Sequence, residues 1–181
     1  GNPDADIAIL VATGCHRSPT QQELLDRYGE DIVAHERIVI HNADDNDSLV
    51  DLGLMASGNR LLLNRVAYEA DFLMAEGFIE PHFFAGFSGG RKAVLPGVVG
   101  RATTMFNHCA ANIDNPGART GLLDHNPIHM DMCEGAQKAG LEFILNVVLN
   151  AKKEVIGAFS GDLDAAHQAG VSFIRQLCRC K

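Results

Sequence analysis

A turn-rich segment between two apolar runs holds the densest set of reactive side chains in this sequence. Residues 80–92 read EPHFFAGFSGGRK and place a histidine, an arginine and a lysine among glycine and serine. Loops tolerate most polar residues, so a loop of such specific composition indicates chemistry more than packing. His82 also precedes two phenylalanines, which would strengthen any charge interaction of its imidazole by excluding water. His82 and Lys92 are therefore the first candidate site residues.

Two further histidines stand in other turns or helix starts. His16 follows an apolar run in residues 12–17 (ATGCHR), and His108 ends residues 104–108 (TMFNH). An imidazole with a pKa of about 6.5 exchanges protons readily at neutral pH. We interpret His16 as a candidate acid–base group and His108 as a third histidine of the same site. The alternatives are a solvated loop histidine for His16 and a half-buried core histidine for His82.

The run Gly89-Gly90-Arg91-Lys92 has two interpretations. Glycines let backbone N–H groups approach a phosphate, and neighbouring cations add positive charge. The run is not a P-loop, because Ala93 follows the lysine where that motif has Ser or Thr. Alternatively, a desolvated Lys92 amine would have a lowered pKa and would act as a nucleophile or carry a covalent modification. The residues alone leave both interpretations open.

The remaining histidines are weaker candidates. His125 and His129 have the i, i+4 spacing of a metal-binding pair on one helical face. Asn126-Pro127 lies between them, however, so we expect His125 to precede the helix. Three others are expected at the surface: His35, His41 and His167.

Composition narrows the classes of protein. The 181 residues are 46% hydrophobic and 21% charged, which is ordinary for a globular protein with a core. A net charge of −8 argues against nucleic acid as the main partner, because phosphate binding needs a basic surface. No apolar run approaches the roughly 20 residues of a membrane helix, so we expect no membrane contact. Five cysteines without C-x-x-C spacing favour a reducing, cytoplasmic location.

Short apolar runs alternate with amphipathic segments along the chain. We expect strands at 7–12, 37–41, 49–54, 71–75, 143–149 and 155–159. We expect one helix that begins at Pro19-Thr20 and ends before Gly29, and further helices at 61–70, 102–111, 126–139 and 163–177. This alternation predicts an α/β fold, a Rossmann-like domain with a mostly parallel, partly mixed sheet flanked by helices. Ligands of such sheets bind at the carboxyl ends of the strands, where the His16 loop and residues 80–92 would meet.

Several of these segments together resemble the lactate racemase family, whose members use a nickel-pincer nucleotide. The resemblance lies in residues 12–17, residues 80–92 and His108, and extends to residues 64–71 (NRVAYEAD) and 95–97 (LPG). It implies that Lys92 holds the cofactor covalently and that His108 is a nickel ligand. It also implies that His16 and His82 are the two catalytic acid–base histidines.

The resemblance further implies racemisation or epimerisation of a 2-hydroxy acid, with lactate as the default substrate. One histidine would remove the hydroxyl proton while a hydride passes to the nickel-pincer nucleotide, a pyridinium mononucleotide that carries nickel. The second histidine would serve the opposite enantiomer. The implied partners are the hydroxy acid and the enzymes that synthesise the cofactor. Residues 1–181 are expected to form a single α/β domain, a fragment of a longer two-domain enzyme that is inactive on its own.

Two other function classes stay open. The first is a non-catalytic nickel- or zinc-binding module that uses His125 or His129. The second is a phosphate- or nucleotide-binding domain that uses residues 88–92. The metal module would keep its metal without Lys92, whereas the phosphate-binding domain would be stabilised by simple mononucleotides and need no metal.

Overall fold

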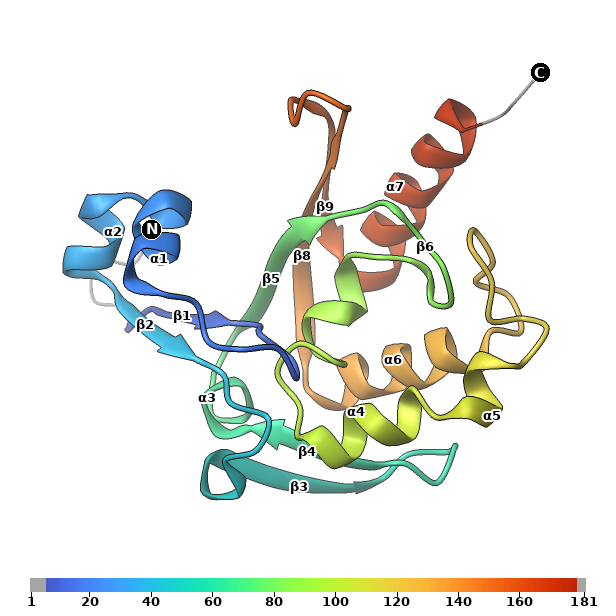
Figure 1. The fold of residues 1–181 in the computed structure, drawn as a ribbon, viewed down its shortest axis with the longest axis horizontal. Helices are drawn as coiled ribbons and strands as arrows, with labels where there is room; N and C mark the ends of the chain where they lie inside the picture. The colour runs from blue at the N-terminus through green and yellow to red at the C-terminus, as the bar shows by residue number, and fades with distance from the viewer. Residues whose placement is uncertain (1–5, 179–181) are drawn as a thin grey trace.

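The computed structural model describes residues 6–178, and its N-terminal part forms a small α/β unit (Figure 1). Strands β1 (Ala8–Val11) and β2 (Arg37–Ile40) pair in parallel. Helices α1 (Gln21–Tyr28) and α2 (Glu30–His35) connect them. Both strands and α1 agree with the sequence prediction, whereas α2 was not expected.

Helix α1 begins and ends at the residues that the sequence indicated. The Thr20 side chain accepts a hydrogen bond from the Glu23 backbone N–H at 3.2 Å, and the Glu23 carboxylate accepts one from the Thr20 N–H at 2.7 Å. This reciprocal pair satisfies N–H groups that a helix start otherwise leaves unbonded. Gly29, with φ of 83°, ends the helix because its backbone conformation is unfavourable for residues with a side chain.

An antiparallel hairpin replaces the helix expected at 61–70. A 3-10 turn, η1 (Asn46–Ser48), leads into β3 (Leu49–Leu54), which pairs with β4 (Arg60–Asn64). Helix α3 spans only Arg65–Tyr68. The helix prediction was wrong because the apolar run at 60–64 pairs with β3, and this pairing overrides helix propensity.

A three-stranded mixed sheet lies at the centre of the molecule. Strand β8 (Leu141–Leu149) pairs in parallel with β5 (Leu73–Phe78) and antiparallel with β9 (Val155–Asp162). Helix α7 (Leu163–Leu177) packs against β8 and β9 (Figure 1). Asp162 caps α7 by accepting hydrogen bonds from the next turn. The predicted bounds of α7 are confirmed, and β5 starts and ends later than expected.

The segment between β5 and β8 holds the candidate site residues. After a short hairpin of β6 (Pro81–His82) and β7 (Gly86–Phe87), a 3-10 turn η2 spans Gly90–Ala93. The helix expected at 102–111 is divided into α4 (Arg101–Asn107) and α5 (Ala110–Ile113). Helix α6 spans Pro127–Lys138, as predicted to within a residue at each end.

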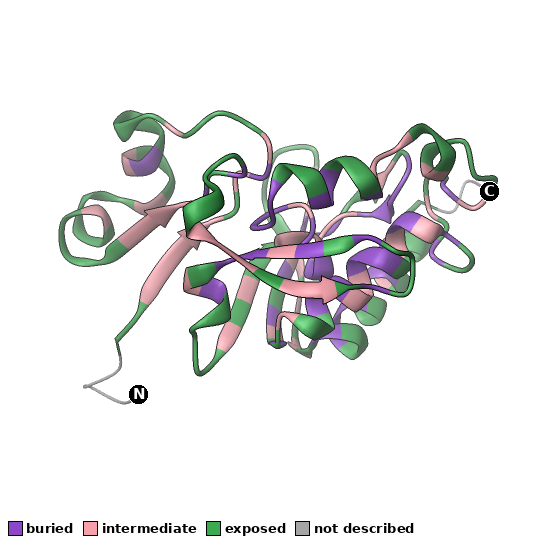
Figure 2. Ribbon diagram, turned by 90° about the horizontal axis from the view of Figure 1, so that it is seen from below, coloured by how far each residue is buried: buried purple, intermediate pink, exposed green. Residues whose placement is uncertain are grey.

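The core lies between η2, β4, α6 and β8. Its members include fully buried leucine, isoleucine and methionine side chains: Leu61, Leu63, Leu95, Ile128, Met132 and Ile144. Figure 2 shows buried residues concentrated in this part of the molecule and few of them in the α1–α2 unit. Burial of apolar area is the main driving force of folding, so η2 is supported by the core of the protein.

The α/β class is confirmed, but the strands of residues 6–178 do not form one mostly parallel sheet. They form four small sheets with two parallel and three antiparallel strand pairs. Short turns, rather than crossover helices, join β3 to β4 and β8 to β9, and such connections require antiparallel pairing. A Rossmann-like arrangement stays a prediction. Within residues 6–178, none of the helices has the length and apolar character needed to cross a bilayer.

Candidate functional site

Three of the four predicted site residues surround one phenylalanine ring. The buried Phe84 ring lies 4.6 Å from the His82 ring and 4.9 Å from the His108 ring, both in edge-on geometry. The Nζ atom of Lys92 lies 5.8 Å from the centroid of the same ring. The fold therefore brings together a hairpin, the η2 turn and the end of α4, which follow one another along the chain.

His108 is held at the end of α4 by backbone and side-chain contacts. Its Nδ1 lies 3.1 Å from the carbonyl oxygen of Thr104, one helical turn earlier. Asn107, which precedes it, is buried and donates a hydrogen bond to Asp131 of α6 at 2.9 Å. Because Nδ1 donates to a carbonyl, Nε2 of the neutral imidazole carries a free lone pair. That nitrogen can bind a metal ion.

His82 is kept neutral by its surroundings. Burial, followed by the charges of Lys92, Arg91 and His108, lowers its pKa from 6.5 to about 4. The Ala85 backbone N–H donates to His82 Nδ1 at 3.2 Å, so the proton of the neutral ring lies on Nε2. His82 also stacks on the exposed ring of Phe83 at 4.8 Å. In this tautomer Nε2–H is a hydrogen-bond donor, and uptake of a proton at Nε2 requires the other tautomer, in which Nδ1 no longer accepts from Ala85.

Lys92 is half-buried and its amine is easier to deprotonate than usual. Burial and then the Arg91 charge lower the Lys92 pKa from 10.5 to about 8, and Glu80 opposes this effect. Burial also lowers the pKa of His108, with a smaller contribution from the Lys92 charge. The neutral fraction of the Lys92 amine near neutral pH is therefore far larger than that of an ordinary lysine, which makes the amine a better nucleophile.

The His16 loop reaches this site through backbone contacts. The Gly14 N–H donates to the Gly97 carbonyl at 2.9 Å, and the Gly97 N–H donates to the Lys92 carbonyl at 3.2 Å. A Cβ atom on Gly97 would lie 2.2 Å from the Ala93 carbonyl oxygen, so only glycine fits there. The two loops therefore meet, but not at one edge of a shared sheet as expected, because the preceding strands β1 and β5 belong to different sheets.

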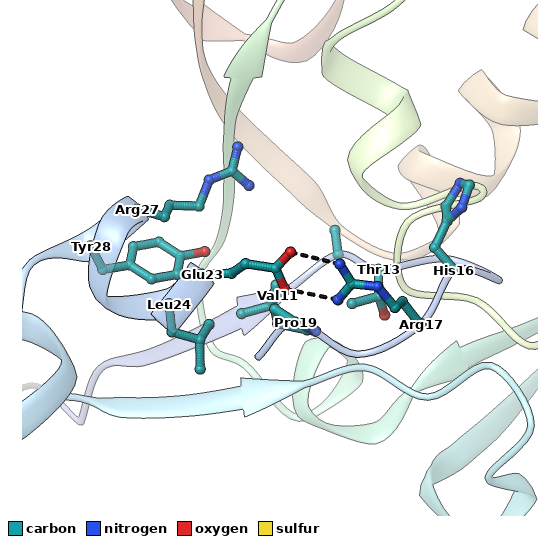
Figure 3. A pocket seen from close by; sticks show the side chains of 10 residues that line it. Val11, Thr13, His16, Arg17, Pro19, Glu23, Leu24, Arg27 and Tyr28 are labelled. Atoms are coloured by element: carbon teal, nitrogen blue, oxygen red, sulfur yellow. Dashed lines mark hydrogen bonds and ion pairs between the residues drawn. The ribbon is translucent and has the colours of Figure 1, made fainter. Parts of the chain in front are cut away.

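His16 itself differs from the other three candidates. It is exposed, and within residues 6–178 its imidazole makes no hydrogen bond. It lines an open hollow of about 530 Å³ together with Arg17, Arg27 and Tyr28. Figure 3 shows His16 at one end of this hollow and Arg27 at the other. The hollow combines an acid–base group with two cations.

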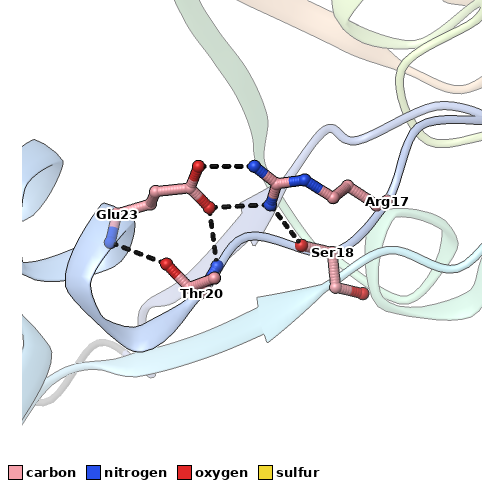
Figure 4. Close-up of polar contacts among 4 residues, drawn as sticks. All are labelled: Arg17, Ser18, Thr20 and Glu23. Atoms are coloured by element: carbon pink, nitrogen blue, oxygen red, sulfur yellow. Dashed lines mark hydrogen bonds and ion pairs between the residues drawn. The ribbon is translucent and has the colours of Figure 1, made fainter.

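Arg17 in this hollow is held by the start of α1. Its guanidinium donates two hydrogen bonds to the Glu23 carboxylate, at 2.6 and 2.8 Å, and a third to the Ser18 carbonyl (Figure 4). The hydrogen bond from Arg17 is the main cause that lowers the Glu23 pKa to about 2. The Glu23 carboxylate therefore serves two purposes: it accepts a hydrogen bond from the N-terminus of α1, and it pairs with Arg17.

Two histidines that we expected at the surface are buried. His41 is 1% exposed; its Nε2 lies 2.9 Å from the Val99 carbonyl and its Nδ1 lies 3.0 Å from the Asn64 amide nitrogen. His167 is 3% exposed and contacts Arg91. Both predictions were wrong because the partners of these rings lie far away in sequence. His35 is exposed, as expected.

His125 and His129 do not share a helical face. Helix α6 begins at Pro127 with Asn126 as its cap, so His125 precedes the helix, as expected. His129 Nδ1 instead accepts a hydrogen bond from Arg91 Nε at 3.0 Å. Across the described part of the chain, no three His, Cys, Asp or Glu residues are grouped so that they could hold a metal ion.

Sequence reasoning missed three contributors to the site: the Thr104 carbonyl, the Phe84 ring as its centre and the buried Arg91 guanidinium. The i−4 spacing of Thr104 from His108 on an expected helix is a signal that could have indicated the first. Phe84 was expected only to pack. No local signal connects Arg91 to His167, because the contact spans 76 positions.

Comparisons with known proteins give the same family as the motifs. Residues 1–121 match the family model described as the lactate racemase N-terminal domain. The chain is 55% identical over 175 residues to a lactate racemase of Lactiplantibacillus plantarum, and 48% identical over 176 residues to one of Thermoanaerobacterium thermosaccharolyticum. Each match covers 97% of this chain but 41% of the relative, so the chain spans less than half the length of these curated relatives.

A solved structure shows the same fold. The lactate racemase apoprotein from Thermoanaerobacterium thermosaccharolyticum superposes with a TM-score of 0.94 at 49% identity, over 95% of this chain and 41% of that chain. The family model covers well over half of the 181 residues, and the structural match covers nearly all of them. The chain therefore belongs to the lactate racemase family.

Proposed function

We propose that this chain forms the cofactor-bearing part of a nickel-dependent 2-hydroxy acid racemase or epimerase, with lactate as the default substrate. The observation that carries the proposal is the arrangement around Phe84, where the Lys92 amine and the His108 imidazole lie against one ring. One group can form a covalent bond and the other can bind a metal ion. A covalently held nickel cofactor needs both at one place.

The residues present fit a nickel-pincer nucleotide. The lowered pKa of Lys92 favours a neutral amine for covalent attachment. His108 directs Nε2 away from its Thr104 contact and can serve as the single protein ligand of nickel. The cofactor itself would supply the other metal donors and, when bound, reversible hydride acceptance. A cluster of several protein ligands is therefore not required.

The proton chemistry falls to His82 and His16. A 2-hydroxy acid loses its hydroxyl proton when its C2 hydride leaves, which gives a planar 2-keto acid. The product enantiomer forms when the hydride returns to the other face of C2 and a histidine returns a proton to the oxygen. His82 is neutral near pH 7 because its pKa is lowered to about 4, and it would accept the hydroxyl proton at Nε2 in the tautomer that has released the Ala85 hydrogen bond at Nδ1. His16 is the second base. Arg17 and Arg27 in the hollow beside it suit a substrate that carries a carboxylate.

The proposal includes partners and surroundings that the chain does not contain. Enzymes that synthesise the cofactor are required, and a cytoplasmic location agrees with free cysteines at Cys15, Cys109, Cys133 and Cys178. Cys180 lies outside the described residues. We also propose that residues 1–181 form one α/β domain of a longer two-domain enzyme, in agreement with the 41% coverage of the relatives.

Mass spectrometry of peptides from the whole protein, isolated from its native host, tests the proposal directly. We expect a nucleotide-sized adduct that contains sulfur and nickel on Lys92, and complete loss of both the adduct and racemase activity in Lys92→Ala. Lys138→Ala is the matched control, because Lys138 is exposed at the end of α6. Unmodified Lys92 in an active wild-type protein would contradict the proposal.

The geometry gives less support to the two alternatives. The Gly90 N–H, which would face a phosphate in a cradle, donates to Asn146 Oδ1 at 2.8 Å, and the Arg91 guanidinium is buried. His129, the residue proposed for the metal module, accepts a hydrogen bond from Arg91. Thermal stabilisation of the apoprotein by a simple mononucleotide, with no metal present, would favour the phosphate-binding alternative.

A further inference from the structure

Arg91 is the most completely bonded side chain of the site region, although the reaction proposed above does not use it. It is 1% exposed, and its guanidinium donates to the backbone carbonyl oxygens of four residues of the preceding turn. These residues are Ala85, Phe87, Ser88 and Gly89, at 2.8–3.2 Å. All four carbonyls therefore point inward toward one cation.

Two imidazoles complete this set of acceptors. His129 of α6 accepts a hydrogen bond from Arg91 Nε at 3.0 Å. The Nε2 atom of His167, on α7, lies 2.8 Å from Arg91 Nη1. Arginine donates only, so His129 Nδ1 acts as an acceptor. His167 Nε2 also lies 3.0 Å from the Ser88 carbonyl oxygen, and it accepts from Arg91 in one neutral tautomer and donates to Ser88 in the other. The guanidinium thereby connects the 85–89 turn to two core helices.

No carboxylate within residues 6–178 pairs with Arg91, which is unusual for a buried arginine. Its acceptors are neutral, and burial followed by the Arg91 charge lowers the pKa of His129 to about 4. The same two causes lower the pKa of His167 to about 3. The positive charge of Arg91 is consequently held inside the protein without an opposite charge beside it.

Lys92 is the next residue of the same 3-10 turn. Its backbone N–H donates a hydrogen bond to the Gly89 carbonyl at 3.2 Å. The same carbonyl accepts a hydrogen bond from Arg91 Nη1 at 3.1 Å. A shift of the guanidinium would therefore shift the backbone that carries Lys92. The charged and titratable groups that act on the Lys92 amine are Arg91, Glu80, His82 and His108.

We propose that Arg91 is a positioning residue, which fixes the turn that presents the Lys92 amine to the site through its contacts with His129 and His167. Its uncompensated charge, held close to Lys92, also favours the neutral form of that amine. The role of Arg91 in cofactor attachment rests on the function proposed above. Its effect on the Lys92 amine of the apoprotein is independent of that function.

The first test measures the amine in the whole protein without cofactor. The rate of acetylation of Lys92 by acetic anhydride is followed by peptide mass spectrometry between pH 6 and 11, relative to Lys138 in the same sample. We expect a midpoint near pH 8 in the wild type. Arg91→Lys keeps the positive charge but loses most of the donors that hold the turn, so a less buried Lys92 amine should have a midpoint about one unit higher, with about fivefold less neutral amine at pH 8. Arg101→Lys, at an exposed arginine paired with Asp44, is the control and should match the wild type.

A second pair of variants covers the case in which Arg91→Lys does not fold. His167→Gln keeps an acceptor for the guanidinium, and His167→Leu removes it. We expect His167→Gln to keep the wild-type midpoint and His167→Leu to raise it. A residue that served only stability would lower the melting temperature in both variants without moving the midpoint of the folded protein.

The third measurement is the fraction of Lys92 that carries the adduct in protein from the native host. We expect a severalfold lower fraction in Arg91→Lys and His167→Leu than in His167→Gln. A wild-type midpoint and adduct fraction in folded Arg91→Lys, or in folded His167→Leu, would overturn the inference. An absent adduct in the wild type would overturn the proposed function but leave the result on the apoprotein amine intact.

Discussion

The Lys92 turn and the His16 loop are connected by backbone hydrogen bonds but are built in opposite ways. The Lys92 turn lies on the core, and its neighbours Phe84 and Arg91 are both buried. His16 is exposed, and its loop is held by Gly14 and by the Arg17–Glu23 pair at the surface. Figure 2 shows the same contrast between the two parts of the molecule.

This difference indicates a division of tasks. Covalent attachment and metal binding need fixed geometry, which a buried hydrogen-bond network supplies. Loss of any member of such a network lowers the stability of the protein. Of the two proposed proton-exchanging histidines, His16 lies at an open surface that a substrate can reach, whereas His82 belongs to the Lys92 region. Substitutions in the two regions should therefore have different consequences, which four experiments can examine.

The largest effect is expected on turnover, from the exposed region. His16→Asn in the whole, cofactor-loaded enzyme removes an acid–base group and should lower kcat about 10²- to 10⁴-fold. Nickel content and melting temperature should not change, because the imidazole makes no hydrogen bond within residues 6–178. Steady-state assays in both reaction directions, with metal analysis of the same samples, check this. Wild-type turnover in His16→Asn would remove His16 from the mechanism.

The next effect concerns stability and compares two arginines. Arg91→Met removes all five N–H donors of the guanidinium from buried carbonyl and imidazole acceptors, and should lower the free energy of unfolding by about 3–5 kcal/mol. Arg17→Met should leave it within error of the wild type, because exposed ion pairs contribute little. Urea titration of both variants measures the difference. Equal decreases in the free energy of unfolding would mean that the two regions do not differ in how much their arginines contribute to stability.

A third experiment concerns the connection between the regions. Gly97→Ala places a Cβ atom 2.2 Å from the Ala93 carbonyl and should cost about 1–3 kcal/mol while displacing the Gly14 contact. Gly135→Ala in α6 is the control, because its Cβ would meet only ordinary contacts at 3.5 Å or more. Thermal denaturation compares the two. An unaltered Gly97→Ala protein would show that the loops are not coupled through this contact.

A fourth experiment concerns the pH dependence of the buried network. The pKa of His129 is lowered to about 4 and that of His167 to about 3, both from 6.5. The unfolded chain therefore binds more protons than the native state between these values, and the free energy of unfolding should fall as the pH drops below 6.5. His167→Gln should reduce this slope, whereas His35→Gln at an exposed position should not. Urea titrations at several pH values between 4 and 7 decide it.

The sequence predicted the candidate residues better than their surroundings. The capping residues of α1 and the proline, asparagine and glycine around α6 marked the ends of these helices, because the signals are local. Residues 60–64 were wrongly expected to be helical, since their strand conformation depends on pairing with β3. Burial of His41 and His167 depends on partners 58 and 76 positions away, which no local pattern indicates.

The sequence by itself determined the family, the α/β class and the four residues expected to act: His16, His82, Lys92 and His108. Each of those inferences depends on residue types and short spacings, which the chain carries before it folds. Only the tertiary structure decided that His82, Lys92 and His108 gather around Phe84 while His16 stays exposed, and that Arg91 is buried beside Lys92. Those facts arise from contacts between distant segments, and such contacts exist only once the core has formed.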